Sequence, residues 1–266
     1  MTKFTTARLA DLHNHILPGV DDGARGLEES LRHLRAFAAD GVTDLAVSPH
    51  LSGWLAREPG AVRLRLARLR TVFRRLRSVC CGLSDVPVLR FSQEVLLPDP
   101  DLARAVLRER GVGVEGTGYV LIEFGFDLSG DPRRVIDVVQ SAGRKPIVAH
   151  PERYRRDGRA VGIEEIREWK EAGALLQVNG GSVLGGYREP AIQPLAWQLL
   201  EEGLADLIGS DSHADHRPVS PGDVGRYMAA RGAGEQARLL LSENPRHVLD
   251  DRPTESVRPW KSEAAA

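Results

Sequence analysis

The sequence predicts a single-domain α/β fold built on a parallel sheet or barrel. Short apolar runs recur along the 266 residues, and a longer stretch with helical periodicity follows most of them. Repeated strand–helix units of this kind are typical of parallel sheets and barrels. Residue types that bind metals stand directly after most of the runs. A chain of this length can bury a core without disulfide bonds or structural metals.

Seven apolar runs are expected to form the strands. They are short, as strands in globular proteins usually are. They lie near residues 8–12, 44–48, 86–91, 119–122, 146–149, 174–178 and 206–208.

Helices are predicted between these runs from the spacing of apolar residues. In the first, Leu27, Leu31, Leu34 and Ala38 share one face, and Gly41 favours a C-terminal end. The second has apolar residues with the same spacing at Val62, Leu66, Leu69, Phe73, Leu76 and Cys80. Others are expected near 131–142, 163–172, 190–202 and 221–230, with two short helices before Leu249. We expect one domain over residues 1–250 and a flexible tail over 251–266.

Composition narrows the classes of partner. The 36 Lys and Arg residues balance 37 Asp and Glu, so the net charge of −1 gives no overall attraction to nucleic acid or to an anionic membrane. The two cysteines, Cys80 and Cys81, are adjacent and cannot form the spaced pairs that clamp zinc or make a redox disulfide. With no secretory signal and no apolar run long enough to span a bilayer, a cytoplasmic location is expected.

The second helix carries seven arginines on the side away from its apolar face. A solvated charged face is the favoured interpretation, and a docking surface for an acidic partner protein or membrane is the alternative. The arginines are Arg63, Arg65, Arg68, Arg70, Arg74, Arg75 and Arg77.

Candidate metal ligands follow six of the seven predicted strands. The carboxyl ends of parallel strands open onto one face of the fold, so these side chains are expected to converge there. Asp22, in the turn after the first strand, can reach the same face. The sixth strand is instead followed by Asn179, which can hydrogen-bond to a ligand or to a metal-binding carboxylate. The strand-end candidates are His13, His15, His50, Glu94, Glu123, His150, Asp211 and His213.

The mixture of imidazole and carboxylate groups indicates Mn, Fe or Zn rather than Ca, which prefers oxygen ligands throughout. Nine ligands are too many for one ion, so two or three ions are expected, with a carboxylate such as Glu94 bridging two of them about 3.5–4 Å apart. Such a centre activates water near neutral pH and stabilises charge during displacement at phosphorus. Phosphate esters are therefore the favoured substrates.

Two arginines support this interpretation. Arg153 and Arg217 each lie a few residues beyond a candidate ligand, and guanidinium groups bind phosphate oxygens in pairs. Pairing with surface carboxylates is the alternative for each of them. The sequence has no Gly-x-Ser-x-Gly nucleophile turn and no Gly-x-x-x-x-Gly-Lys phosphate loop. His33, His216 and His247 lie away from the strand ends and are expected to be structural or exposed.

These motifs together resemble the bacterial polymerase-and-histidinol-phosphatase (PHP) superfamily, and in particular its capsular-polysaccharide branch of manganese-dependent protein-tyrosine phosphatases. The similarity runs from about residue 11 to residue 245, nearly the whole chain. The motifs are DLHNHILPGVDDG at 11–23, LEESL at 27–31, SPH at 48–50, LIEF at 121–124, AHPERY at 149–154, QVN at 177–179 and SDSH at 210–213.

The resemblance implies a distorted (β/α)7 barrel with a trinuclear, Mn2+-loaded centre held by the nine candidate ligands, and Arg153 and Arg217 gripping the phosphate. It implies a phosphotyrosine substrate on the tail of a tyrosine autokinase that controls exopolysaccharide and capsule synthesis. Three departures bear on substrate access, and one of them is a short loop between His213 and Arg217. Leu51 stands where a second histidine is expected, and residues 53–60 lack the expected polar and aromatic character.

Two other interpretations keep the fold and the site. One is a PHP-type phosphatase acting on a small phosphomonoester such as histidinol phosphate, or on a nucleic-acid phosphodiester, although the near-neutral charge disfavours nucleic acid. The other is a regulator that binds the kinase without turnover, which the retention of all nine ligand types disfavours. The sequence leaves open the partner kinase, the metal loaded in the cell and the oligomeric state.

Overall fold

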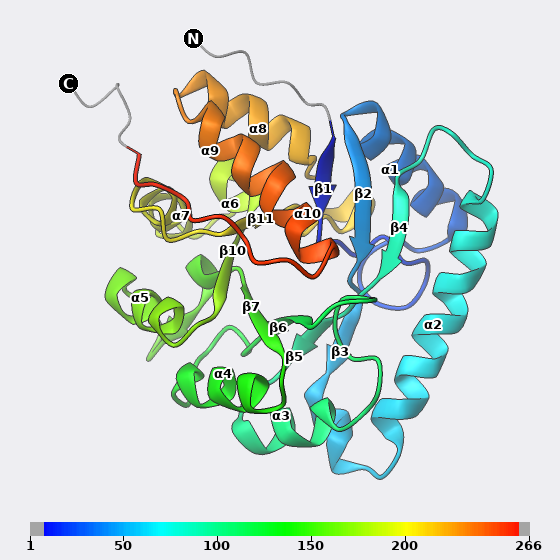
Figure 1. Ribbon diagram of the computed structural model, residues 1–266, viewed down its shortest axis with the longest axis horizontal. Helices are drawn as coiled ribbons and strands as arrows, with labels where there is room; N and C mark the ends of the chain where they lie inside the picture. Colours follow the sequence, from blue (N-terminus) through cyan, green and yellow to red (C-terminus); the bar gives the residue numbers. More distant parts are fainter. Residues whose placement is uncertain (1–7, 261–266) are drawn as a thin grey trace.

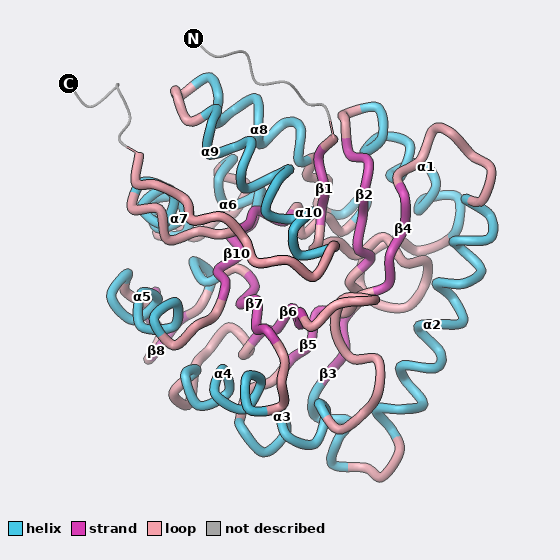
Figure 2. The backbone as a smooth tube through the Cα atoms, viewed as in Figure 1, coloured by secondary structure: helices cyan, strands magenta, loops and turns pink. Residues whose placement is uncertain are grey.

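Two parallel sheets occupy the centre of the molecule, with helices packed around them (Figures 1 and 2). The computed structural model describes residues 8–260. One sheet has the strand order β1-β2-β4, and the other has the order β11-β10-β7-β6-β5-β3. The parallel strands are β1 (Leu9–Asp11), β2 (Val42–Val47), β3 (His50–Ser52), β4 (Val88–Phe91), β5 (Glu94–Leu96), β6 (Tyr119–Glu123), β7 (Lys145–Ala149), β10 (Leu175–Asn179) and β11 (Leu207–Gly209).

The mixed α/β architecture with parallel strands agrees with the sequence prediction, but two short strands that were not predicted, β3 and β5, follow the predicted strands at 44–48 and 86–91. β2 continues into β3 past Pro49, and β4 continues into β5, so each contributes to both sheets. Proline has no amide hydrogen to donate to a sheet, so the change of partner falls where one hydrogen bond is lost in any case. An antiparallel hairpin, β8 (Arg155–Arg156) with β9 (Arg159–Ala160), was not predicted.

Helices lie on the outer side of the strands (Figure 1). Several begin at a residue that caps them. Asp99 accepts hydrogen bonds from the Asp101 and Leu102 amides at the start of α3 (Pro100–Leu107), a helix that was not predicted. The remaining helices are α1 (Leu27–Ala39), α2 (Ala61–Cys80), α4 (Pro132–Ser141), α5 (Ile163–Glu171), α6 (Gly180–Leu184), α7 (Ile192–Glu201), α8 (Pro221–Ala230), α9 (Gly234–Arg238) and α10 (Asn244–Leu249).

The strands are held in place by apolar packing between the sheets and the surrounding helices. All five residues of β6 are buried, as expected for a strand covered on both faces. Beside it, Trp169 of α5 is fully buried, with its ring centroid 5.8 Å from that of Phe124 and 5.7 Å from that of Tyr154. Tyr154 belongs to the segment that follows β7, so this aromatic group anchors the chain just beyond that strand end.

The chain after α10 packs on the domain, which differs from the predicted flexible tail. The Asn244 side chain exchanges hydrogen bonds with the backbone of Glu255, and Val257 is buried. The Trp260 amide donates to the Glu201 carbonyl, and its ring lies 6.1 Å from that of Trp197. Apolar contacts therefore hold this segment to residue 260, and residues 261–266 lie outside the described part. No helix within residues 8–260 is long and apolar enough to cross a bilayer.

Candidate metal centre

The carboxyl ends of the strands bring the candidate ligands together. His13 and His15 follow β1, His150 follows β7, and Asp211 and His213 follow β11. The remaining strand-end candidates lie within short strands, with His50 first in β3, Glu94 first in β5 and Glu123 last in β6. Asp22 approaches from the loop after β1, where Gly23 packs so tightly on the His15 carbonyl that a Cβ atom would overlap it.

Glu94 lies at the centre of the group. Its Oε1 atom is 2.8 Å from His150 Nε2 and 3.3 Å from His13 Nε2. Its Oε2 atom is 2.9 Å from His50 Nδ1 and 3.4 Å from His15 Nε2. One carboxylate thus faces four imidazoles from three different strand ends, an arrangement that suits a ligand bridging two ions.

The other carboxylates occupy the edges of the same group. Asp211 Oδ1 is 3.5 Å from His13 Nε2 and 3.4 Å from His15 Nε2. Asp22 Oδ1, which is largely exposed, lies 3.3 Å from His50 Nε2 and 3.4 Å from His213 Nε2. Glu123 is more distant, with 3.9 Å from its oxygens to His50 Nδ1 and to His150 Nε2.

Three subsets have ligand atoms that all lie within 4.8 Å of one another, close enough to share an ion. The subsets overlap in three residues, so they form one continuous centre rather than separate sites. They are His15, Asp22, His50 and His213; His13, His15 and Glu94; and His50, Glu94 and Glu123.

The donor atoms fit divalent metal ions. Within residues 8–260, the buried atoms His13 Nε2, His15 Nε2 and Glu94 Oε2 make no hydrogen bond. Such unsatisfied buried atoms are costly unless something else binds them. All three point into the cluster, and imidazole with carboxylate is the donor set that Mn, Fe and Zn accept. The residues present therefore fit a metal centre.

Contacts between the buried histidines and carboxylates of the cluster shift their pKa values. Burial alone would lower the pKa of His13, but the neighbouring Glu94 and Asp211 carboxylates raise it. For Glu94, burial opposes the charge, and the surrounding histidines hold its pKa well below the ordinary value. Burial and the nearby Glu94 charge raise the pKa of Glu123 to about 8. Without cations, the pocket thus holds opposed charges, and divalent ions can replace the protons.

Two of the six non-glycine residues that have a positive φ within residues 8–260 are candidate ligands. His150 has a φ of 39° and Asp211 has a φ of 48°, in the left-handed region that side chains rarely adopt. Residues in this region cost roughly 1–2 kcal/mol each, and they persist where the surroundings hold them. Strain of this kind is frequent at functional sites.

Three further side chains support the candidate ligands, and one of them, Gln177, was given no role from the sequence. Gln177 Oε1 lies 2.5 Å from His13 Nδ1, so it orients that imidazole from inside β10. Asp21 Oδ2 lies 3.1 Å from His15 Nδ1 and accepts the His50 amide. Asn179 donates to Asp211 Oδ2 at 2.6 Å, the contact to a carboxylate that its position suggested. A polar residue within an otherwise apolar strand, as at Gln177, is the signal that could have revealed such a partner.

Arg153 and Arg217 both lie at the centre, and neither pairs with a distant surface acid as the alternative required. Arg153 Nη1 donates to Asp211 Oδ2 at 2.9 Å, and Arg217 Nη2 is 2.8 Å from the same oxygen. The Arg153 guanidinium also lies 4.5 Å from the ring centroids of both Phe126 and Tyr187. Two cations thus border the cluster at Asp211, where they could meet an anionic group.

The histidines away from the strand ends make other contacts. His33 Nε2 lies 2.8 Å from Asp215 Oδ1, and the His247 ring contacts the Pro253 carbonyl. Glu29, His33 and Asp215 form a further group with metal-binding geometry. Ion pairs with Arg25 and Arg32 already engage its carboxylates, so this group is explained as a charge network.

The arginines of α2 are partly engaged within the protein. Arg65 donates to the carbonyls of Val20 and His50, and Arg70 donates to the Gly111 carbonyl. Arg63 and Arg77 pair with glutamates. These contacts support a structural and solvated role for much of this face.

Leu51 is fully buried in β3 and points away from His50, so the expected second histidine would not share its direction. Residues 53–57 form a 3₁₀ turn in which the ring of Trp54 is 42% exposed, so an aromatic group is present there.

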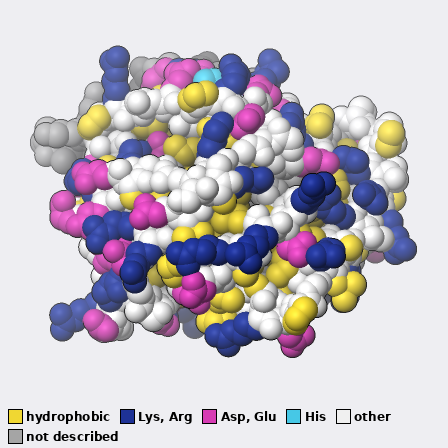
Figure 3. Space-filling model, turned by 60° about the horizontal axis from the view of Figure 1, so that its bottom comes forward, with side chains coloured by type: hydrophobic (Ala, Val, Ile, Leu, Met, Phe, Trp, Pro, Cys, Tyr) yellow, Lys and Arg dark blue, Asp and Glu magenta, His cyan; other side chains and the backbone are white. Residues whose placement is uncertain are grey.

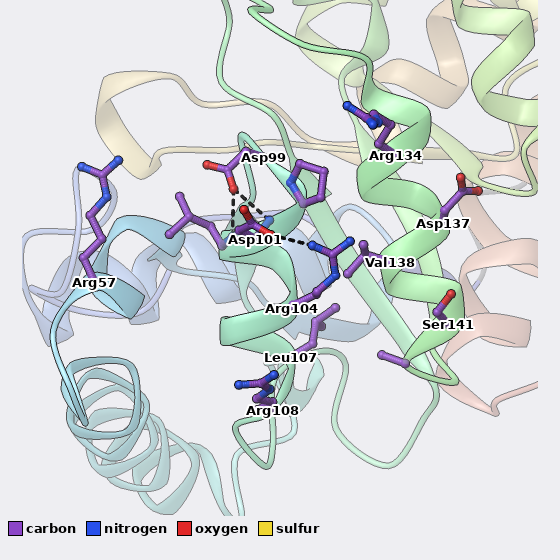
Figure 4. A pocket seen from close by; sticks show the side chains of 13 residues that line it. Arg57, Asp99, Asp101, Arg104, Leu107, Arg108, Arg134, Asp137, Val138 and Ser141 are labelled. Carbon is purple, nitrogen blue, oxygen red and sulfur yellow. Dashed lines mark hydrogen bonds and ion pairs between the residues drawn. The ribbon is translucent and has the colours of Figure 1, made fainter.

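A cavity of about 1000 Å3 lies elsewhere, between α3 and α4 (Figure 4). Arg104, Arg108 and Arg134 project from the two helices there, and lysines and arginines gather on the face of the molecule that includes these helices (Figure 3). None of the candidate metal ligands lines this cavity, so it is separate from the cluster.

Comparison with known proteins identifies the family. The profile of the family described as "Capsular polysaccharide synthesis, CpsB/CapC" matches residues 9–250. The chain belongs to this CpsB/CapC family. It is 29% identical over 252 residues to the tyrosine-protein phosphatase YwqE of Bacillus subtilis, covering 91% of each chain. It is 25% identical over 252 residues to the tyrosine-protein phosphatase CpsB of Streptococcus pneumoniae, covering 92% of this chain and 99% of the relative.

A solved structure supports the same family assignment. The fold superposes with a TM-score of 0.72 and 26% identity on a chain from the crystal structures of YwqE from Bacillus subtilis and CpsB from Streptococcus pneumoniae. Those two proteins are described as unique metal-dependent tyrosine phosphatases. The match covers 95% of this chain and 100% of that chain. The family suggested by the sequence motifs is therefore confirmed.

Proposed function

We propose that this CpsB/CapC protein is a metal-dependent protein-tyrosine phosphatase that acts on the phosphotyrosine-bearing tail of a bacterial tyrosine autokinase in capsule or exopolysaccharide regulation. The proposal depends on seven candidate ligands in overlapping metal-binding groups, on the contacts of His150 and Asp211 with that cluster, and on Arg153 and Arg217 beside it. The names of YwqE and CpsB, both tyrosine-protein phosphatases, support the choice of substrate. A cytoplasmic location and the absence of nucleic-acid partners remain predictions.

The nine side chains would hold two or three divalent ions, with Mn2+ first and Fe or Zn as alternatives. Glu94 would bridge ions, because its two oxygens face different pairs of imidazoles. When bound, the ions supply Lewis acidity and lower the pKa of water. The proposed ligands are His13, His15, Asp22, His50, Glu94, Glu123, His150, Asp211 and His213.

The chain's own groups would bind and orient the phosphate. Arg153 and Arg217 approach from the Asp211 side, where their guanidinium groups would neutralise phosphate oxygens. Gln177 would keep the His13 Nδ1 atom engaged so that Nε2 faces the cluster. A phenolate leaves more readily than an alkoxide, so a strong general acid is not required for a phosphotyrosine.

We also propose that the two sheets form one distorted (β/α)7 barrel. The isolated parallel bridge between Asn14 and Ser212 supports this, since it joins the chain after β1 to the chain after β11. Hydrogen bonds from the Asp211 amide to the His13 carbonyl, 2.7 Å, and from the His15 amide to the Ser212 carbonyl, 2.8 Å, lie at the same junction. Closure there would place all candidate ligands on one rim.

The decisive experiment measures turnover by manganese-loaded protein on a phosphotyrosyl peptide, histidinol phosphate and single-stranded DNA. We expect hydrolysis of the peptide to be fastest and to be lost on chelation. Faster hydrolysis of histidinol phosphate or DNA would favour a different phosphoesterase. Absence of turnover on every ester, with tight binding to a kinase tail, would favour the regulator instead.

A further inference from the structure

A second cavity, of about 470 Å3, adjoins the candidate metal centre at Arg153. Its walls come from the loop after β6, the segment after β7 with the β8–β9 hairpin, and the loop between α6 and α7. Its volume is within the range of about 300–1,000 Å3 that is usual for small-molecule sites. The residues that matter here are Phe126, Arg153, Tyr154, Tyr187 and Ile192, all of which line it.

Arg153 joins this cavity to the metal cluster. Its Nη1 atom donates to Asp211, while its guanidinium lies 4.5 Å from the ring centroids of Phe126 and of Tyr187. At these distances the aromatic rings attract and orient the cation. Tyr187 is fixed in turn, because its hydroxyl accepts from the Asn179 side chain at 3.2 Å. An anion held by Arg153 would therefore have its organic substituent beside these aromatic rings.

Phe126 is the unusual member of this wall. Its side chain remains 40% exposed, although its ring centroid is only 5.6 Å from that of His150. An exposed phenyl ring at the edge of a cluster of charged groups gains from being covered by another apolar group. An aromatic ring covers it best, because two aromatic rings attract each other more strongly than their buried area alone would give.

We propose that this cavity binds the aryl group of an aryl phosphate monoester, and that Phe126 is the residue that selects aryl over alkyl esters. This inference rests on the proposed phosphatase function and deepens it. Phosphate would be held by Arg153 and the metal centre in both kinds of ester. Only an aryl ester has a ring that would cover Phe126. Selection of aryl over alkyl esters would therefore arise from the cavity and not from the phosphate contacts.

Binding of phosphonates tests the inference without requiring turnover. Dissociation constants of phenylphosphonate, methylphosphonate and inorganic phosphate are measured by calorimetry on manganese-loaded protein, for wild type, Phe126→Ala and Phe126→Leu. Leu64→Ala is the matched control, since Leu64 is an exposed apolar residue on α2. We expect wild type to prefer the phenyl over the methyl compound. Phe126→Ala should weaken phenylphosphonate about three- to tenfold and leave the other two unchanged. The affinity of Phe126→Leu for phenylphosphonate should lie between those of wild type and Phe126→Ala.

Three results would overturn the inference. Wild type could bind the two phosphonates equally or bind neither. All three ligands could weaken together in Phe126→Ala, which would make Phe126 a support for Arg153 only. Phenylphosphonate could bind unchanged while a phosphotyrosyl pentapeptide weakens, which would assign the cavity to a flanking side chain. Selective weakening of phenylphosphonate in protein that hydrolyses no phosphotyrosyl peptide would refute the proposed function and leave the aryl subsite standing.

Discussion

Arg153 Nη1 lies 2.9 Å from Asp211 Oδ2, and the Arg153 guanidinium lies between contacts to two aromatic rings. The arginine is therefore held by cation–π contacts as well as by its ion pair with Asp211. Lysine cannot reproduce this, because its ammonium group is a point charge without a planar face. Position and planarity, more than charge alone, are expected to matter at this residue.

Replacing Arg153 with lysine should lower kcat/KM for a phosphotyrosyl peptide by about 100-fold, because the paired donors to phosphate are lost. Manganese content should stay the same, since Arg153 is not among the proposed ligands. Steady-state kinetics with elemental analysis would measure both. Arg134→Lys, in the separate cavity between α3 and α4, is the matched control and should keep wild-type rates. A change of less than twofold in Arg153→Lys would remove this residue from the phosphate site.

Replacing Gln177 with leucine should weaken manganese binding by about 10- to 100-fold, the usual effect of losing a residue that orients a metal-binding histidine. The buried His13 Nδ1 atom would lose its 2.5 Å partner. Titration of each protein with manganese, recorded by calorimetry, would measure the change in affinity. Gln193→Leu is the control, because that glutamine contacts the Val183 carbonyl away from the cluster. Equal manganese affinity in wild type and Gln177→Leu would mean that His13 needs no such support.

His150→Ala should lose both bound metal and turnover. His150 Nε2 is 2.8 Å from Glu94 Oε1, the oxygen that His13 Nε2 also faces. Metal bound only by the native state also raises stability, by roughly 4 kcal/mol when the free metal is 1,000 times its dissociation constant. Manganese should therefore raise the melting temperature of wild type much more than that of His150→Ala. His247→Ala should respond as wild type does. Unchanged metal content and rate in His150→Ala would refute the assignment.

The strand-end positions of the candidate ligands could be predicted because parallel strands share one polarity. Once residues such as His50, Glu94 and His150 were placed after strands, convergence followed from the topology. The supporting residues have no such rule. Phe126 and Tyr187 lie in loops, whose paths depend on tertiary contacts that spacing along the chain does not encode.

Other features that were not predicted have local signals in the sequence, which apolar periodicity does not include. Asp99 followed by Pro100 is a helix start, and it precedes the unpredicted α3. Val257 and Trp260 are apolar residues in a stretch expected to be a loose tail, and both pack on the domain. The division of β2 from β3 falls at Pro49, but the change of sheet depends on the curvature of both sheets together.

Asp206 gives a prediction of pH dependence away from the metal centre. It lies in the loop before β11, where it accepts from Lys170 Nζ at 2.8 Å and from the Leu176 amide at 2.9 Å. Burial raises its pKa above the ordinary carboxyl value, and the contact with Lys170 only partly opposes this. The folded state therefore binds this proton more tightly than the unfolded state does.

Because the folded-state pKa is the higher one, the contribution of Asp206 to stability is complete below the unfolded-state pKa and declines as pH rises through the folded-state pKa. Asparagine cannot ionise, so Asp206→Asn should gain stability relative to wild type as pH rises from about 4 towards neutrality. Urea unfolding of both proteins in chelator at several pH values would measure the difference. A difference that stays constant would mean that burial and Lys170 cancel at Asp206. A loss of stability of Asp206→Asn relative to wild type as pH rises would show that Lys170 outweighs burial, and that ionised Asp206 stabilises the fold.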